Sequence, residues 1–229
     1  MLKNSFNFFF VNYWKNIDKK ILFCFLILFF LGLFFSFSST SSLAGERLNK
    51  DYYFFFTKHL LFTFTALIIM ILISIIKTEF IIKYTLHIFI ISFILLALVP
   101  IIGVEVKGAK RWLDLYFFRL QPIEILKPLF ILLTVKILTF EKLKDTQIKY
   151  ILSFIILSSV IILLIDQPDL GQSILLIGTW IATVFVSGVS FLYILVFFII
   201  FLVSLASLLF LMPEKFGYVI NRLVTFLDP

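Results

Sequence analysis

Charged residues are scarce in this sequence, whereas hydrophobic residues are abundant. Only 14% of the 229 residues are charged and 62% are hydrophobic. A soluble domain has about 25% charged residues, so this composition excludes an ordinary soluble protein and predicts a helical membrane protein with several spans. Segments of about ten residues that alternate between polar and apolar side chains are also absent, which argues against an outer-membrane barrel.

The single cysteine and the two histidines limit the metal and redox chemistry that the sequence predicts. Cys24 lies in the first apolar run, so neither an intramolecular disulfide nor a cysteine metal cluster is expected. His59 and His87 are far apart in the sequence and predict no metal site. The net charge of +7 would suit nucleic acid, but no solvated domain exists to present a basic face. Anionic membrane lipid is the expected partner for that charge.

Seven apolar runs have the length of a membrane span, which is about 17–25 residues. They cover residues 21–38, 59–76, 84–102, 121–139, 149–165, 171–187 and 190–211. No internal repeat, low-complexity linker or soluble insertion interrupts them. The sequence therefore predicts an all-α fold, a polytopic helical bundle of the inner membrane, with residues 1–229 in a single transmembrane domain.

Lysines near the ends of these runs predict that the N-terminus, residues 1–20, is cytoplasmic. The lysines on that side are Lys3, Lys15, Lys19, Lys20, Lys77, Lys83, Lys142, Lys144 and Lys149. The opposite side is not depleted of cations, because residues 103–120, the predicted outer basic loop, carry Lys107, Lys110, Arg111 and Arg119. Cations kept outside against the usual bias suit an anionic, membrane-anchored ligand such as a lipid phosphate.

Several side chains of the outer basic loop have the chemistry of phosphate binding. Gly103 and Gly108 allow tight turns with positive φ, so that backbone N–H groups and cations can converge. Arg111 can grip a phosphate with two parallel hydrogen bonds, and Lys107 supplies a compact charge. Trp112 suits the headgroup level of the bilayer. The alternative is a charged loop that merely contacts headgroups.

Two ionisable residues follow inside the next apolar run. Glu124 and Lys127 are three residues apart, so a helix places them on one face, and Pro122 suits the start of that helix. The pair is either a self-neutralising structural pair or a cavity site in which Lys127 meets phosphate or sugar and Glu124 orients it. Ionisable groups at membrane depth cost about 2.5–3.5 kcal/mol each on insertion scales, which favours a functional role.

A third polar segment, residues 166–173, separates the fifth and sixth runs. Asp169 precedes a predicted helix and can cap its free N–H groups, and Gly171 permits close packing. A capping or packing role is therefore the favoured interpretation of this segment.

Four strings of this sequence together resemble a known protein family. The strings GVEVKGAKRWLDL, LQPIEILKP, DQPDLGQS and NRLVTFLDP are similar to those of the SEDS proteins (shape, elongation, division and sporulation; the FtsW and RodA proteins). The similarity is greater to the cell-division FtsW branch, of alphaproteobacterial type, and it extends over the whole chain. The combination of VKGAKRWL with QPIE and the lysine that follows is far more specific than any single motif.

The resemblance implies a peptidoglycan glycosyltransferase that polymerises lipid II at the outer face of the inner membrane during septal wall synthesis. The implied substrate-binding residues are Lys107, Arg111, Glu124 and Lys127. The family's structural motifs correspond to Trp112, Gln121, Pro122, Pro168, Asp169, Gly171, Arg222 and Asp228. The implied partners are lipid II, undecaprenyl-pyrophosphate-linked glycan, a single-span transpeptidase (a penicillin-binding protein) and other division proteins, with no nucleic acid. No metal ligand is predicted, and a divalent cation on the pyrophosphate is left open.

The sequence departs from the family pattern at its C-terminal end. Family members have some ten spans and carry the catalytic aspartate in a large outer loop, whose start corresponds to residues 212–229. The chain is thus expected to be an N-terminal part that lacks the catalytic base and is inactive alone. Two other readings are a lipid II flippase and a non-catalytic division scaffold.

Overall fold

The computed structural model describes Trp14 and residues 17–40, 53–106, 108–116 and 118–190, together with scattered residues from 192 to 207. These residues fall into two compact units, Met1–Ile81 and Ile82–Pro229, and each is described by itself. The expected single transmembrane domain stays a prediction. Lys107, Arg222 and Asp228 lie outside the described residues.

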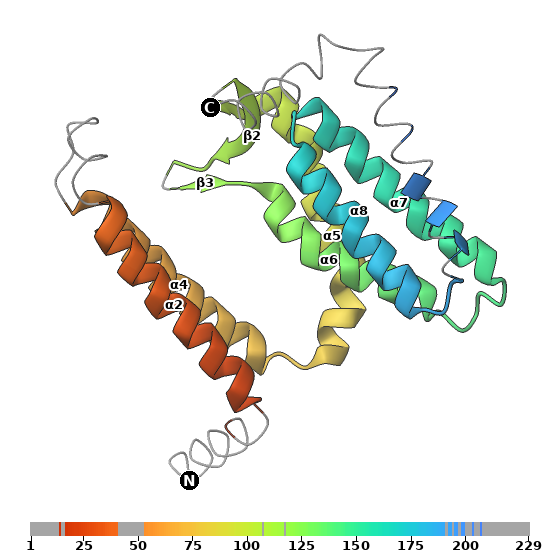
Figure 1. Cartoon of the computed structure of the whole chain (residues 1–229), viewed down its shortest axis with the longest axis horizontal. Helices are drawn as coiled ribbons and strands as arrows, with labels where there is room; N and C mark the ends of the chain where they lie inside the picture. Colours follow the sequence, from red (N-terminus) through yellow and green to blue (C-terminus); the bar gives the residue numbers. More distant parts are fainter. Residues whose placement is uncertain are drawn as a thin grey trace. The chain divides into compact units, whose positions relative to one another are not determined.

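Most of the described residues of the first unit form two antiparallel apolar helices, α2 (Lys19–Thr40) and α4 (Phe54–Ile75) (Figure 1). The Asp18 carboxylate accepts hydrogen bonds from the N–H groups of Lys20 at 2.9 Å and Ile21 at 3.2 Å, which caps α2. In the apolar stretches of both helices that are long enough to span a membrane, no residue is buried inside the protein. Because apolar side chains cover these helices all round, their surfaces suit the hydrocarbon of a bilayer.

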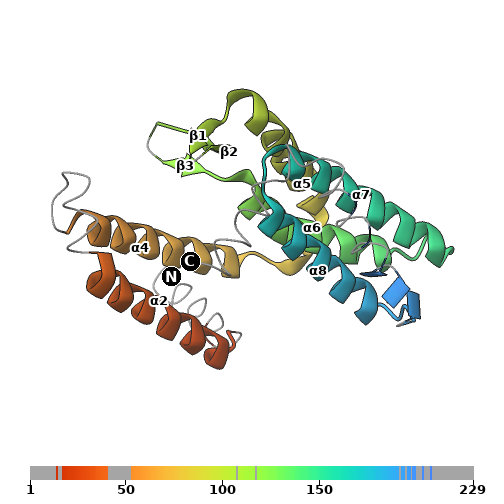
Figure 2. The same ribbon diagram turned by 45° about the horizontal axis from the view of Figure 1, so that its top comes forward.

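Within residues 78–190, the structure packs four helices around one apolar core. They are α5 (Thr78–Ile102), which begins before the boundary between the units, α6 (Pro122–Leu138), α7 (Thr146–Asp166) and α8 (Leu170–Val186). Helices α6, α7 and α8 lie side by side (Figure 2). The core side chains are Phe89, Leu96, Ile123, Leu126, Leu129, Phe130, Leu133, Leu157, Val160, Leu164, Leu176, Ile177, Trp180 and Val184.

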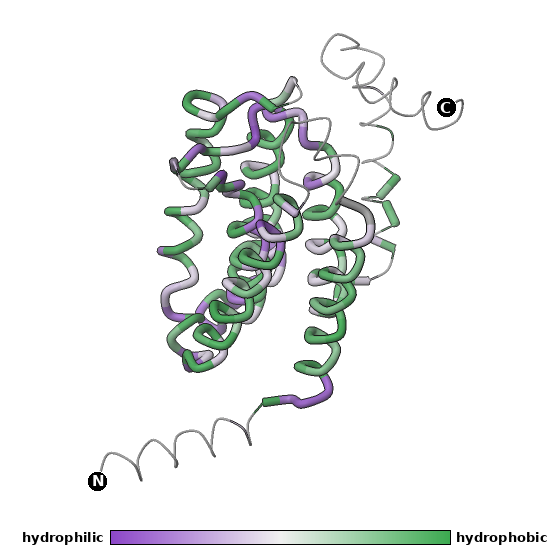
Figure 3. Tube along the Cα trace, turned by 90° about the vertical axis from the view of Figure 1, so that its left-hand side faces the viewer, coloured by the Kyte–Doolittle hydropathy of each residue, from purple (hydrophilic) through white to green (hydrophobic). Residues whose placement is uncertain are grey.

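The helices confirm the predicted fold class, a polytopic membrane protein. Six of the seven predicted spans coincide with α2, α4, α5, α6, α7 and α8, and most of the seventh, 190–211, lies outside the described residues. Apolar residues dominate the helices (Figure 3). In the part of the chain that the structure describes, four helices are long and apolar enough to span a membrane. Helices α6 and α8 have only 17 residues each, which corresponds to about 26 Å.

The predicted outer basic loop contains a small sheet that the all-helical expectation missed. Strands β1 (Val104–Val106), β2 (Ala109–Asp114) and β3 (Arg119–Leu120) are antiparallel in the order β1-β2-β3. Val106 pairs with Ala109, and Gly108, which directly precedes β2, has a φ of 78°. The strands are too short to show a clear alternating pattern in the sequence.

Gly103 serves a different purpose from the positive φ predicted for it. Its backbone is not in the left-handed region, but a Cβ atom added there would lie 2.3 Å from the Val99 carbonyl oxygen and 3.2 Å from that of Trp112. Both contacts are to backbone, so they cannot be relieved by a side-chain rotation. Glycine is therefore needed where α5 and β2 approach each other closely.

We expect Gly103→Ala to destabilise the protein by about 1–3 kcal/mol, because the hairpin must shift away from the end of α5. Gly178→Ala is the matched control, since a Cβ there, in the middle of α8, meets no atom within 4 Å in the described part of the chain. Alanine should stabilise that helix by about 0.5–1 kcal/mol. Thermal unfolding in detergent micelles measures both effects. Equal unfolding temperatures for the two variants would contradict the close approach at Gly103.

Candidate functional site

Polar side chains gather where β2, the start of α6 and the start of α8 meet. Strand β2 supplies Arg111, the N-terminal turns of α6 supply Glu124 and Lys127, and the α7–α8 connection leads to Asp169 and Gln172. Contacts among these residues, described below, hold the three elements together. The structure therefore brings together residues from all three polar segments that the sequence singled out.

Arg111 bonds the backbone of the α7–α8 turn. Its Nε donates to the carbonyl oxygen of Gln167 at 3.2 Å, and its Nη2 donates to that of Pro168. The same Nε lies 3.8 Å from Asp169 Oδ2. We call these contacts the Arg111 clamp. A planar guanidinium suits such a clamp because its N–H groups point in fixed directions. The predicted contact of Arg111 with phosphate stays a prediction.

Asp169 occupies the residue before α8, but its side chain does not cap the helix. Its carboxylate, only 11% exposed, faces Arg111 and accepts a hydrogen bond from Gln121 Nε2 at 3.4 Å. The predicted capping role is wrong because the ion pair and the amide outside the helix take the carboxylate. The close packing predicted for Gly171 is also wrong, since a Cβ added there would meet no atom of the described residues within 4 Å.

Glu124, Lys127 and Gln172 form a closed ring of hydrogen bonds between α6 and α8. Lys127 Nζ lies 2.6 Å from Glu124 Oε2 and donates to Gln172 Oε1 at 2.9 Å. Gln172 Nε2 in turn donates to the other Glu124 oxygen, Oε1, at 3.1 Å. The predicted pairing of Glu124 with Lys127 on one helix face is confirmed. The Lys127 side chain is 20% exposed and that of Glu124 is 51% exposed, so the ring sits at the edge of the bundle.

The contact of Gln121 with Asp169 lies one helical turn from the contacts of Gln172 with Glu124 and Lys127. Together they form one row of polar contacts between α6 and α8. We call these five residues the α6–α8 seam. Gln121, directly before α6, and Glu124 and Lys127 within it are spaced three apart, and Asp169, directly before α8, and Gln172 have the same spacing. This spacing places each set on one face of its helix.

Gln167 ties the same turn to α5 and was missed by the sequence interpretation. Its side chain amide donates to the carbonyl oxygen of Leu96 at 3.0 Å, and the residue is only 2% exposed. Pro100 lies four residues after Leu96 inside α5 and has no N–H for that carbonyl. A glutamine amide therefore satisfies an acceptor that the proline leaves open. Pro100 indicates in the sequence that the Leu96 carbonyl lacks its helical donor, but no local pattern indicates which residue donates to that carbonyl instead.

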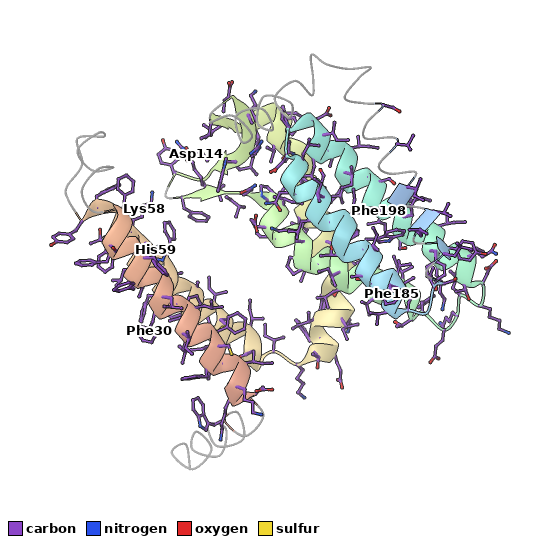
Figure 4. The ribbon with its side chains drawn as sticks, in the orientation of Figure 1. Phe30, Lys58, His59, Asp114, Phe185 and Phe198 are labelled. Carbon is purple, nitrogen blue, oxygen red and sulfur yellow. The ribbon has the colours of Figure 1, made fainter. Side chains whose placement is uncertain are left out.

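Two more of the predicted residues, Trp112 and Pro122, have structural positions. Trp112 is half-buried in β2 and pairs with Val104. Pro122 is the first residue of α6 and is buried, as expected at a helix start. Asp114, labelled in Figure 4, lies on the hairpin 3.7 Å from Arg119 Nε, where both side chains are about half exposed.

Among the described residues, no group of three or more His, Cys, Asp or Glu side chains is placed to hold a metal ion. A mostly apolar cavity of about 630 Å³ is lined by residues that include Tyr150, Trp180 and Val184. It lies at the start of α7 and the end of α8, which is the opposite end of these helices from the Arg111 clamp.

Comparisons with known proteins agree with the resemblance seen in the sequence. A protein from Wigglesworthia glossinidia brevipalpis, described as "Probable peptidoglycan glycosyltransferase FtsW", is 34% identical over 214 residues, which cover 93% of this chain and 55% of that protein. A protein of the same description from Aliivibrio salmonicida is 31% identical over 93% of this chain and 52% of that protein. The chain thus spans about half the length of these curated relatives.

A solved chain and a family model complete the comparison. A chain from a peptidoglycan synthase complex has the same fold, with a TM-score of 0.71 at 22% identity over 88% of this chain and 58% of that chain. The family model described as "Cell cycle protein", for FtsW, RodA and SpoVE, matches residues 18–229. The chain therefore belongs to the FtsW/RodA/SpoVE family of cell cycle proteins.

Proposed function

We propose that this chain forms the part of a peptidoglycan glycosyltransferase that holds the diphosphate of a polyprenyl-linked sugar substrate, lipid II or the growing glycan. One observation carries the proposal: Lys127 is held at the edge of the bundle by Glu124 and Gln172. An ammonium group has three N–H donors. Glu124 and Gln172 take two of them among the described residues, which leaves one for a phosphate oxygen.

The chemistry of glycan transfer explains what such a cation would do. A sugar hydroxyl attacks the anomeric carbon of the polyprenyl-linked donor, and the bond to the diphosphate breaks. Negative charge then grows on the leaving diphosphate, and a preorganised cation stabilises it. Lys127 supplies that charge in the proposal, and Arg111 keeps the hairpin in place. We assign the general base of the reaction to no residue of 111–127 and to none in the α7–α8 turn.

The cellular setting is proposed from the relatives. The curated relatives are named FtsW, and the description of the family is "Cell cycle protein". We propose that the protein acts in septal wall synthesis, in the inner membrane, with a cytoplasmic N-terminus. A chain of similar fold occurs in a peptidoglycan synthase complex that polymerises and crosslinks, which supports a single-span transpeptidase as partner.

Lys127→Ala should weaken binding of undecaprenyl pyrophosphate by about tenfold or more, the loss expected for a hydrogen bond to a charged group. The chain in lipid nanodiscs is titrated with this lipid, and bound lipid is measured by native mass spectrometry. Lys110→Ala is the matched control, because Lys110 is exposed on β2 and should change affinity less than twofold. Equal, small effects of both variants would favour mere headgroup contact and contradict the proposal.

Glycan strand formation separates a polymerase from a lipid flippase, since both would bind the lipid. A complete family member with the Lys127→Ala change at this position should lose polymer formation from lipid II in detergent, where no membrane potential exists. Unchanged polymer formation would show that the α6–α8 seam is not part of the polymerase site.

A further inference from the structure

Gln172, in the first turn of α8, contacts both charged side chains of α6. Its amide oxygen accepts from the Lys127 ammonium at 2.9 Å, and its amide nitrogen donates to the Glu124 carboxylate at 3.1 Å. The amide is therefore oriented with each end toward the group of opposite polarity. A hydroxyl has a single heavy atom with which to make both contacts, and a carboxylate could not donate to Glu124.

The packing of α6 on α8 does not depend on this amide. Leu126 and Phe130 of α6 and Leu176 and Ile177 of α8 belong to the buried core. Gln172 lies at the partly exposed end of the helices, beyond those side chains. A role in placing its two charged neighbours is thus better supported than a role in helix packing.

We propose that Gln172 is a positioning residue that fixes the Lys127 ammonium for its diphosphate ligand; this inference rests on the proposed function. A free lysine side chain has four rotatable bonds to order when it binds an anion. Contacts with Glu124 and Gln172 order it beforehand, which lowers the cost of binding. Gln172 is neutral, so it restrains Lys127 without adding a second negative charge beside the phosphate. Glu124 alone would restrain the ammonium from one side of the ring.

A double-mutant cycle tests whether Gln172 acts through Lys127. The full chain in nanodiscs is titrated with undecaprenyl pyrophosphate as wild type, Q172A, K127A and the double variant. Q172A should weaken binding about three- to tenfold, as expected when one ordered side chain becomes free. In the K127A background, Q172A should change binding less than twofold, because the group that it positions is gone. Gln147→Ala, at an exposed amide at the start of α7, is the control and should bind as wild type.

Each result decides the proposal. If Q172A weakens binding equally with and without Lys127, or not at all while K127A weakens it, the positioning role is wrong and the proposed function stands. If K127A binds as wild type, both fall. Q172M has a similar length, favours helix and makes neither hydrogen bond, so it should match Q172A. It replaces Q172A in the cycle if the circular dichroism of Q172A shows loss of helix.

Discussion

Arg111→Ala should destabilise the second unit by about 3 kcal/mol. The change removes the donors to two backbone carbonyls, those of Gln167 and Pro168, and the cation beside Asp169. Removing one partner of a buried pair costs about 3–5 kcal/mol because the other charge stays behind. The Arg111 side chain is 24% exposed, so a value at the low end is expected. Urea unfolding in micelles measures the change.

Arg111→Lys should recover little of this loss. Lysine keeps the positive charge, but its ammonium is a compact point and cannot donate in the fixed fork geometry that serves two neighbouring carbonyls. Arg119→Ala on the same hairpin is the control. Its pair with Asp114 spans 3.7 Å between side chains that are 54% and 48% exposed, and such pairs contribute about 0–1 kcal/mol. If Arg119→Ala costs as much as Arg111→Ala, the Arg111 clamp does not hold the turn.

Gln167→Leu should cost about 2–3 kcal/mol, and Pro100→Ala should remove most of that cost. Leucine cannot donate to the Leu96 carbonyl, which is left without its amide partner in a buried place. An unsatisfied buried acceptor costs about 1–3 kcal/mol in proteins and more where water is absent. Alanine at position 100 supplies the missing helical N–H to the same carbonyl.

The comparison is made as four unfolding curves, for wild type, Gln167→Leu, Pro100→Ala and the double variant. The double variant should be more stable, by about 1–2 kcal/mol in its free energy of unfolding, than the sum of the two single changes predicts. Additive losses would mean that the Gln167 amide does not replace the N–H that Pro100 lacks, and that it contributes to stability for another reason.

Hydropathy predicted the helices well because a bilayer allows few alternatives to a helix. The run 84–102 lies within α5, which begins at Thr78, and the run 149–165 lies within α7, which begins at Thr146. The missed ends carry charged residues such as Glu79, which lower the local hydropathy below that of an apolar run. The sheet of the hairpin was missed because its pairing is made between segments of two to six residues.

The site was predictable where it is local and not where it is tertiary. Spacing alone placed Glu124 beside Lys127, since three residues are nearly one helical turn. Gln172 is 45 residues from Lys127, and no local pattern links them. Arg111 contacts backbone carbonyls, which every residue has and which give no signal in a sequence. Asp169 shows a local rule overridden, because an arginine from β2 takes the carboxylate that would have capped α8.

The most direct test is an NMR measurement of the distance between the Lys127 side-chain nitrogen and the phosphorus of the lipid diphosphate. The chain with ¹⁵N-labelled lysine side chains is placed in nanodiscs with undecaprenyl pyrophosphate, and dephasing of the lysine ¹⁵Nζ signal by ³¹P is recorded. A lysine within hydrogen-bonding distance of a phosphate should give strong dephasing that disappears in Lys127→Ala and persists in Lys110→Ala. Dephasing that survives Lys127→Ala, or is absent from the wild type, would contradict the assignment of this cation to the diphosphate.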